Sequence, residues 1–204
     1  MKIGFAIITD SPFFEQIIAF EHHFHVEGGF FDSLGSEKNL PHTTLFQGDM
    51  DEAIDYRSIA DIIAEKFVRL LPDRVIAFDK IVYVPEGWYF LECRRDPPLF
   101  ELHEEVLKLV RPHIHLDPAR LDRDTGVMTR EQIRGVQVYG YRYAGKAFYP
   151  HITIGRTLKE SAPLLFRMNA ALDKIERTSC ISRITVYRMG PNGTHESTLY
   201  QVQL

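Results

Sequence analysis

Apolar residues recur at helical spacing in four segments of the chain. Between residues 58 and 71, Ile59, Ile63 and Phe67 fall on one face of a helix. Ahead of another such segment, Ser11-Pro12 offers an N-cap and a first-turn proline, and Gly28-Gly29 offers a stop. The pattern predicts helices over residues 11–25, 58–71, 98–110 and 161–175.

Short apolar or alternating runs bounded by glycine and proline indicate strands. They cover residues 2–9, 41–48, 74–85, 88–94, 135–144, 147–157, 182–189 and 197–203. The last six form three pairs separated by short turns, at 86–87, 145–146 and around 190–193, which is typical of hairpins. Residues 113–134 show no periodicity, and we expect a long loop excursion there. Hairpins favour an α+β fold with mostly antiparallel sheets over a doubly wound parallel sheet.

One pentapeptide pattern occurs twice, once in each half of the chain. Pro41–Leu45 reads PHTTL and Pro150–Ile154 reads PHITI, and the two histidines are 109 residues apart. Two chance occurrences of Pro-His-x-Thr-aliphatic in a chain of this length are expected on the order of 1 in 10⁵. In a strand, residues i and i+2 point to the same face, so each histidine shares a face with its threonine.

Two histidines and two threonines that meet in one cleft can together catalyse a reaction at a phosphodiester. A neutral imidazole takes a proton from an attacking oxygen, and a charged imidazole gives one to a leaving oxygen. Threonine hydroxyls donate hydrogen bonds to the non-bridging oxygens of a phosphodiester and oppose the charge that builds there. The candidate catalytic residues are therefore His42, Thr44, His151 and Thr153, in a mechanism that requires no metal.

With its motifs HTTL at His42 and HITI at His151, the sequence resembles the 2H phosphoesterase superfamily, which includes the bacterial 2′-5′ RNA ligase-like proteins and the cyclic phosphodiesterases. The resemblance implies a single bilobal domain over residues 1–204, with pseudo-two-fold halves, sheets flanked by helices, and the active cleft between the lobes. It also implies metal-free hydrolysis of a 2′,3′-cyclic phosphate or a 2′-5′ phosphodiester in a small nucleotide or RNA end, or the reverse ligation.

Two other classes of function remain open. A protein with the same cleft could bind nucleotides or RNA ends without turnover. A metal-dependent hydrolase would use the cluster His22, His23 and His25 or the pair His113 and His115, although further ligands for either cannot be named from the sequence.

Candidate substrate-binding residues flank the two motifs. Phe46 and Tyr149 continue the faces of the motif histidines and either stack on a base or ribose or pack in the core. Tyr139, Tyr141 and Tyr143 form an aromatic stripe, explained more often by cross-strand packing than by a ligand. The cations near the second motif either contact substrate or lie solvated on the surface: Arg134, Arg142, Lys146 and Arg156. Strand alternation puts Arg156 opposite His151 unless the strand bulges or ends at Gly155.

Composition and charge narrow the choice of binding partner and of cellular compartment. The chain has 204 residues and a net charge of −4, which argues against binding to long nucleic acid. The first 102 residues hold 9 basic and 18 acidic side chains, whereas the rest hold 15 and 10, so the second half is suited to an anionic ligand. Neither a signal peptide nor a membrane span is evident, and we expect a cytoplasmic monomer without cofactor, in which Cys93 and Cys180 are buried thiols.

Overall fold

Seven strands form one antiparallel sheet in the part of the chain that this computed structural model describes, residues 1–84, 87–116, 128–158 and 160–204. The strand order is β1-β2-β5-β4-β3-β6-β7, and β1 also pairs with β6. The strands are β1 (Lys2–Thr9), β2 (Thr43–Asp49), β3 (Val75–Val84), β4 (Trp88–Cys93), β5 (His151–Arg156), β6 (Thr178–Met189) and β7 (His195–Gln203). The α+β class expected from the hairpins is confirmed.

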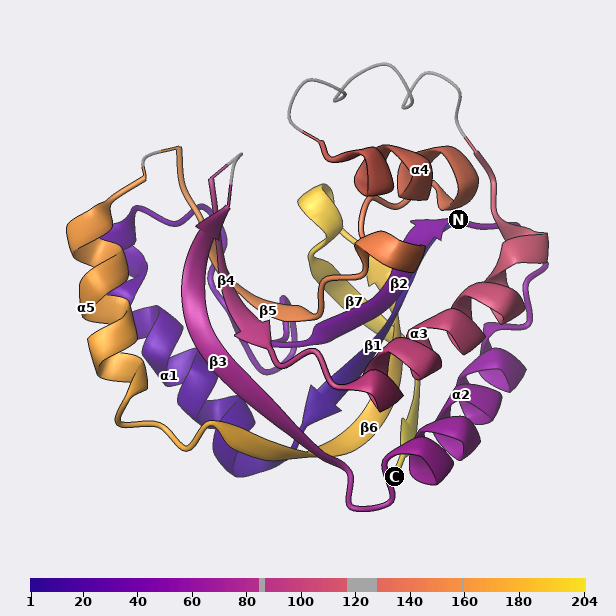
Figure 1. Cartoon of the computed structure of the whole chain (residues 1–204), viewed down its shortest axis with the longest axis horizontal. Helices are drawn as coiled ribbons and strands as arrows, with labels where there is room; N and C mark the ends of the chain where they lie inside the picture. The colour runs from indigo at the N-terminus through magenta and orange to yellow at the C-terminus, as the bar shows by residue number, and fades with distance from the viewer. Residues whose placement is uncertain (85–86, 117–127, 159) are drawn as a thin grey trace.

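The sheet has two halves that meet at β2 and β5. One half contains β1, β2 and β7 with most of β6, and the other contains β3, β4 and β5 (Figure 1). The long strand β6 joins them, because Thr178–Cys180 pair with β3 and Ile181–Arg188 pair with β1. Each half therefore carries one of the two repeated motifs, on β2 and on β5.

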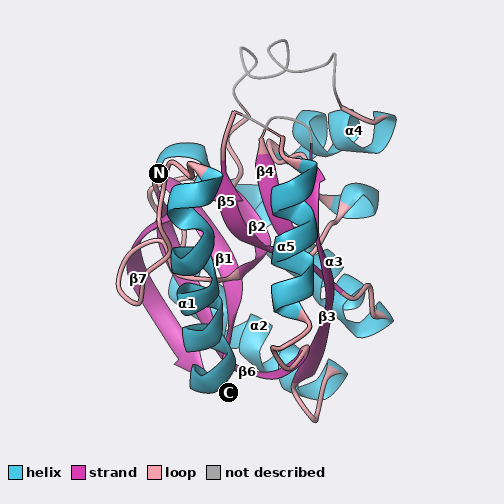
Figure 2. Cartoon of the chain, turned by 90° about the vertical axis from the view of Figure 1, so that its left-hand side faces the viewer, coloured by secondary structure: helices cyan, strands magenta, loops and turns pink. Residues whose placement is uncertain are grey.

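Helices cover the outer faces of the two halves. They are α1 (Ser11–Gly28), α2 (Tyr56–Leu70), α3 (Pro97–Val110) and α5 (Ala162–Leu172), whereas α4 (Arg130–Tyr139) packs against residues 145–147. Helices α1 and α5 pack behind β5 and β3, while α2 and α3 pack behind β6, β7 and β2 (Figures 1 and 2). Within the described residues, no helix is both long and apolar enough to cross a membrane.

The helix ends follow local chemistry. Helix α1 ends where Gly29 adopts the left-handed conformation (φ 58°), as the Gly28-Gly29 pair predicts. The side chain of Asp55 caps α2 by accepting a hydrogen bond from the Ser58 backbone N–H, and Ser161 caps α5 in the same way through Leu164. All four helices expected from the periodicity are present.

The prediction of a strand over 135–144 was wrong. Helix α4 occupies Arg130–Tyr139, so the expected excursion over 113–134 also ends earlier than predicted, and residues 117–127 of it lie outside the described residues. A reciprocal capping box between Thr129 and Gln132 begins the helix and Gly140 (φ 67°) ends it. Strand β5 pairs with β4 and β2 in place of the expected hairpin partner.

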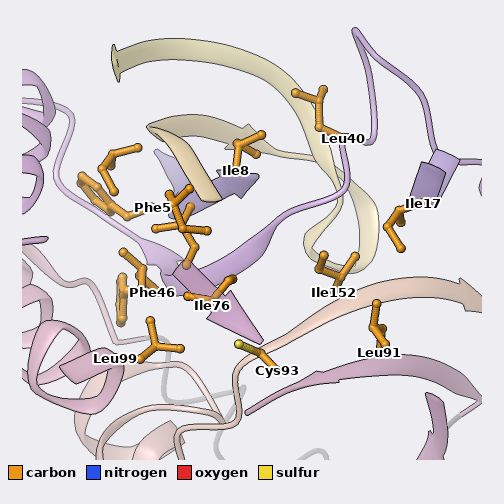
Figure 3. Packing of buried hydrophobic residues seen from close by; sticks show 14 of the residues in the cluster. Phe5, Ile8, Ile17, Leu40, Phe46, Ile76, Leu91, Cys93, Leu99 and Ile152 are labelled. Atoms are coloured by element: carbon orange, nitrogen blue, oxygen red, sulfur yellow. The ribbon is translucent and has the colours of Figure 1, made fainter. Parts of the chain in front are cut away.

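Buried side chains fill the space between the sheet and the helices. Figure 3 shows Phe5, Phe46 and Leu99 on one side of this core and Ile17, Leu91 and Ile152 on the other. Cys93 is buried as expected, and burial raises the pKa of its thiol to about 12. The expectation that Cys180 is buried was wrong: it pairs with Val75 at the start of β6, where alternation turns its side chain outward.

Helix α4 can lie close to the chain that follows it because residue 135 is glycine. A Cβ atom at Gly135 would stand 2.8 Å from the carbonyl oxygen of Tyr141 and 3.1 Å from that of Arg142. We therefore expect Gly135→Ala to lower the free energy of unfolding by about 1–3 kcal/mol through overpacking. Urea denaturation would measure this loss, and the exposed Gln137→Ala on the same helix should stay within about 0.5 kcal/mol of wild type. Equal stability of Gly135→Ala and wild type would contradict the close packing.

Candidate active site

The two motif strands touch at a single register pair, Thr43 opposite Ile152. In an antiparallel pair, this register sets His42 opposite Thr153 and Thr44 opposite His151. All four side chains line one cavity of about 280 Å³. Pro41 and Pro150, each just before a motif histidine, carry no N–H to extend the ladder, which keeps the contact between the strands short.

Each motif histidine is fixed by the backbone carbonyl two residues before it. The Nδ1 atom of His42 lies 2.6 Å from the Leu40 oxygen, and Nδ1 of His151 lies 2.6 Å from the Tyr149 oxygen. Because a carbonyl oxygen only accepts, both bonds require the Nδ1–H tautomer. Both Nε2 atoms are then proton acceptors in the neutral rings, which is the state that a general base needs.

Aromatic rings pack against the two imidazoles. His151 stacks on Phe90, with ring centroids 3.6 Å apart, while Tyr143 and Tyr149 lie 5.5 Å away. His42 lies 5.0 Å from the ring of Tyr187. Burial lowers the pKa of His42, and it lowers that of His151 to about 4, so both rings are neutral in the free protein at pH 7.

Both motif strands bulge directly after the motif, and the bulges change which side chains face the cavity. On β2, Ala6 pairs with Thr44 but Phe5 pairs with Phe46, so Leu45 is an extra residue. On β5, Phe90 pairs with Thr153 but Tyr89 pairs with Gly155, so Ile154 is the extra residue. The bulges turn Gln47 and Arg156, each five residues after a motif histidine, into the cavity.

The rest of the cavity is lined by two groups of side chains, one aromatic and apolar and the other polar. The first consists of Trp88, Phe90, Met128, Val136, Tyr141 and Tyr143. Polar side chains come from the loops before β2 and before β7: Asp32, Asn39, Asn192 and Thr194. Sequence reasoning did not single out any of these except the two tyrosines, because strand β4, helix α4 and the loops that carry them have no motif.

The sequence-based candidates for substrate binding divide into two groups. Arg142 and Arg156 line the cavity, whereas Arg134 and Lys146 are exposed outside it. Phe46 is fully buried in the core, which is the packing alternative left open above. Tyr149 is half-buried beside the His151 ring, and its hydroxyl donates a hydrogen bond of 2.5 Å to Glu92.

A third buried histidine ties the two motif strands together from behind. His103 on α3 donates from Nδ1 to the Leu45 carbonyl (2.7 Å) and accepts at Nε2 from the Gly145 N–H (2.9 Å). Its ring stacks on Phe148 at 3.9 Å, and burial lowers its pKa to about 4. It joins the bulge of β2 to the turn before β5, a link between distant segments that no local pattern reveals.

The other histidine clusters lie outside the cavity and have partners that hold the fold together. His25 contacts the fully buried carboxylate of Glu21 at 2.5 Å, and Glu21 also accepts from Ser33 and the Leu34 N–H, which fixes the loop before β2. His115 forms an ion pair with Asp51. Among the described residues, no three His, Cys, Asp or Glu side chains are grouped to hold a metal ion.

Fold and site together describe an antiparallel α+β protein with a cavity between two His-Thr strands. Its fold is similar to that of E. coli LigT in apo form, with a TM-score of 0.54, 15% identity and coverage of 100% of this chain and 96% of LigT. E. coli LigT complexed with 3′-AMP gives a TM-score of 0.51, 16% identity and coverage of 100% and 97%. No family model matches the sequence, and no curated protein does. The likeness establishes the LigT fold for this chain.

Buried neutral histidines make stability depend on pH. The pKa values of His103, His151 and His195 are lowered to about 4 by burial, against roughly 6.5 in an unfolded chain. Between these values the unfolded chain binds more protons than the native one, so the free energy of unfolding falls as the pH falls from 6.5 toward 4. Each linked proton contributes a slope of about 1.4 kcal/mol per pH unit.

Urea denaturation at pH 7.0, 6.0 and 5.0 tests this expectation. His103→Gln lacks one of the titrating groups and should show a smaller pH slope than wild type, whatever its absolute stability. A free energy of unfolding that is constant or rises from pH 7.0 to 5.0 would contradict the neutral, buried state of these rings.

Proposed function

We propose that this protein is a metal-independent phosphodiesterase that acts on a 2′,3′-cyclic phosphate or a 2′-5′ phosphodiester of a small nucleotide or RNA end. The observation that carries the proposal is the convergence of two Nδ1-anchored histidines and two threonines in one cavity. The HxT motifs resemble those of the 2H phosphoesterases, and the LigT fold agrees with that resemblance.

The reaction needs one neutral and one protonated histidine. The neutral ring accepts at Nε2 the proton of an attacking water, whose oxygen forms a bond to phosphorus. The P–O bond to one ribose oxygen breaks, and the protonated ring gives that oxygen its proton. In the reverse ligation the same two groups exchange roles, so the site serves both directions.

The threonines and the burial of the imidazoles complete the proposed chemistry. Hydroxyls of Thr44 and Thr153 donate to the non-bridging phosphate oxygens, where negative charge builds in the transition state. The bound phosphodiester is an anion, and its charge raises the pKa of the adjacent imidazoles. Substrate binding thereby offsets the desolvation that keeps both rings neutral in the free protein and allows one of them to protonate.

The cavity suits a small substrate. Its volume of about 280 Å³ lies near the lower end of the range for small-molecule sites. Its aromatic wall fits the planar face of a nucleobase. E. coli LigT, which has a similar fold, was crystallised with 3′-AMP, and this supports a nucleotide in the proposal.

Removal of either motif histidine tests the proposed function. We expect His42→Ala and His151→Ala each to lower kcat for 2′,3′-cyclic nucleotides by about 10²–10⁴, since each removes a general acid or base. Hydrolysis followed by chromatography, with 2′-5′ oligomers as further substrates, provides the measurement. EDTA should leave the rate unchanged, and the exposed His23→Ala should match wild type.

Three outcomes would contradict this proposal. Activity that survives both histidine substitutions would separate the chemistry from the motifs. Activity that is lost in EDTA would indicate a metal-dependent hydrolase. Nucleotide binding without turnover of any of these substrates would indicate a binding protein that retains the cleft.

A further inference from the structure

The cavity has two unlike ends, although the two strands that form it carry the same motif and both bulge after it. Gln47 stands three residues beyond Thr44 on β2, and Arg156 stands three residues beyond Thr153 on β5. Because β2 and β5 run antiparallel, the two side chains lie toward opposite ends of the cavity. One end therefore presents a neutral amide and the other a cation.

The bulges fix how far each of these residues lies from the centre. Thr153 pairs with Phe90 and Arg156 with Trp88, so they are two partner-strand positions apart, or ~6.6 Å along the sheet. The same count applies on β2, where Thr44 pairs with Ala6 and Gln47 with Gly4. Two phosphates attached to the same sugar are separated by a similar distance.

The Arg156 end is built to hold an anion in one orientation. The guanidinium lies 5.0 Å from the centroid of the Trp88 ring, and Trp88 lies 6.2 Å from Phe90. This cation–π contact with the indole holds the Arg156 side chain beside β4. The planar fork of a guanidinium suits bidentate contact with a phosphate. Among the described cavity residues Arg142 and Arg156 are the cations and Asp32, which is exposed, is the carboxylate.

The side chain of Gln47 is held by uncharged partners. The Tyr187 hydroxyl donates to Oε1 of Gln47 at 3.2 Å, and Tyr187 reaches it across β1 because residue 4 is glycine. Gly193 (φ 82°) packs against the same amide, since a Cβ there would stand 2.8 Å from Gln47. Amides and hydroxyls of this kind pair with sugar hydroxyls and offer no charge to a phosphate.

From these two ends we infer that the substrate carries a second phosphate, one sugar away from the scissile phosphodiester, and that Arg156 on its Trp88 platform binds it. The inference rests on the proposed function, because the quartet of histidines and threonines marks the position of the reacting phosphate. It adds a direction: the phosphorylated side of the sugar points along β5, and the uncharged side points toward Gln47.

The test compares adenosine 2′,3′-cyclic phosphate with the same compound carrying a 5′-phosphate. We expect wild type to show at least ~10-fold higher kcat/KM for the 5′-phosphorylated substrate, the factor given by about 1.4 kcal/mol from one charged hydrogen-bonded contact. In Arg156→Gln this preference should fall to within about twofold of unity. Arg156→Lys, which keeps the charge without the planar fork, should retain only part of it.

Arg134→Gln is the matched control, because it removes the same charge from an exposed position outside the cavity. It should keep the full wild-type preference. A wild type without preference, or an Arg156→Gln variant that lowers kcat/KM equally for both substrates and so keeps the ratio, would overturn the inference. The second result would mean that Arg156 supports a stacked base and does not read a phosphate.

A binding measurement separates this inference from the proposed function. Calorimetry with 3′-AMP and adenosine 3′,5′-bisphosphate requires no turnover. Tighter binding of the bisphosphate, abolished in Arg156→Gln, would support the second phosphate site even if neither cyclic nucleotide were hydrolysed, a result that would count against the phosphodiesterase alone. Equal affinity of wild type for both compounds would overturn the phosphate site.

Discussion

A single antiparallel contact, Thr43 opposite Ile152, determines where the whole site lies. This register faces each motif histidine with the threonine of the other motif, so neither half of the sheet contains a complete site. Helices α1 and α5 support one half from outside and α2 and α3 support the other, which leaves the opposite face for the cavity. His103 reinforces the contact from behind by joining the β2 bulge to the turn before β5.

The two halves of the sheet are alike at the motif residues, and they differ at the cavity positions beyond the motifs, which are placed to orient a substrate. Both histidines use the carbonyl two residues earlier, and both strands bulge after the motif. The likeness ends at the next cavity position, which is Gln47 on one strand and Arg156 on the other. The proposed substrate, a phosphodiester, has two different oxygen substituents, and an asymmetric cavity of this kind can distinguish them.

The elements with strong local signals could be predicted from the sequence, and the details set by tertiary contacts could not. The spacing of apolar residues and the capping residues indicated four of the helices, and the repeated Pro-His-x-Thr-aliphatic pattern located the two motif strands. The stripe of Tyr139, Tyr141 and Tyr143 at alternate positions fitted the predicted strand over 135–144. The capping box of Thr129 and Gln132 and the close packing of Gly135 instead make residues 130–139 a helix. The bulges moved Phe46 into the core and brought Gln47 into the cavity, because a one-residue shift reverses every later side chain.

The central claim is that backbone carbonyls hold both motif histidines as neutral Nδ1–H tautomers with Nε2 toward the substrate. Long-range ¹H–¹⁵N NMR correlation of the imidazole nitrogens tests it most directly, with His42→Gln and His151→Gln providing the assignments. At pH 7 the account predicts a protonated Nδ1 and an unprotonated Nε2 for both rings in the free protein. A proton on Nε2 and none on Nδ1 in either ring would contradict it.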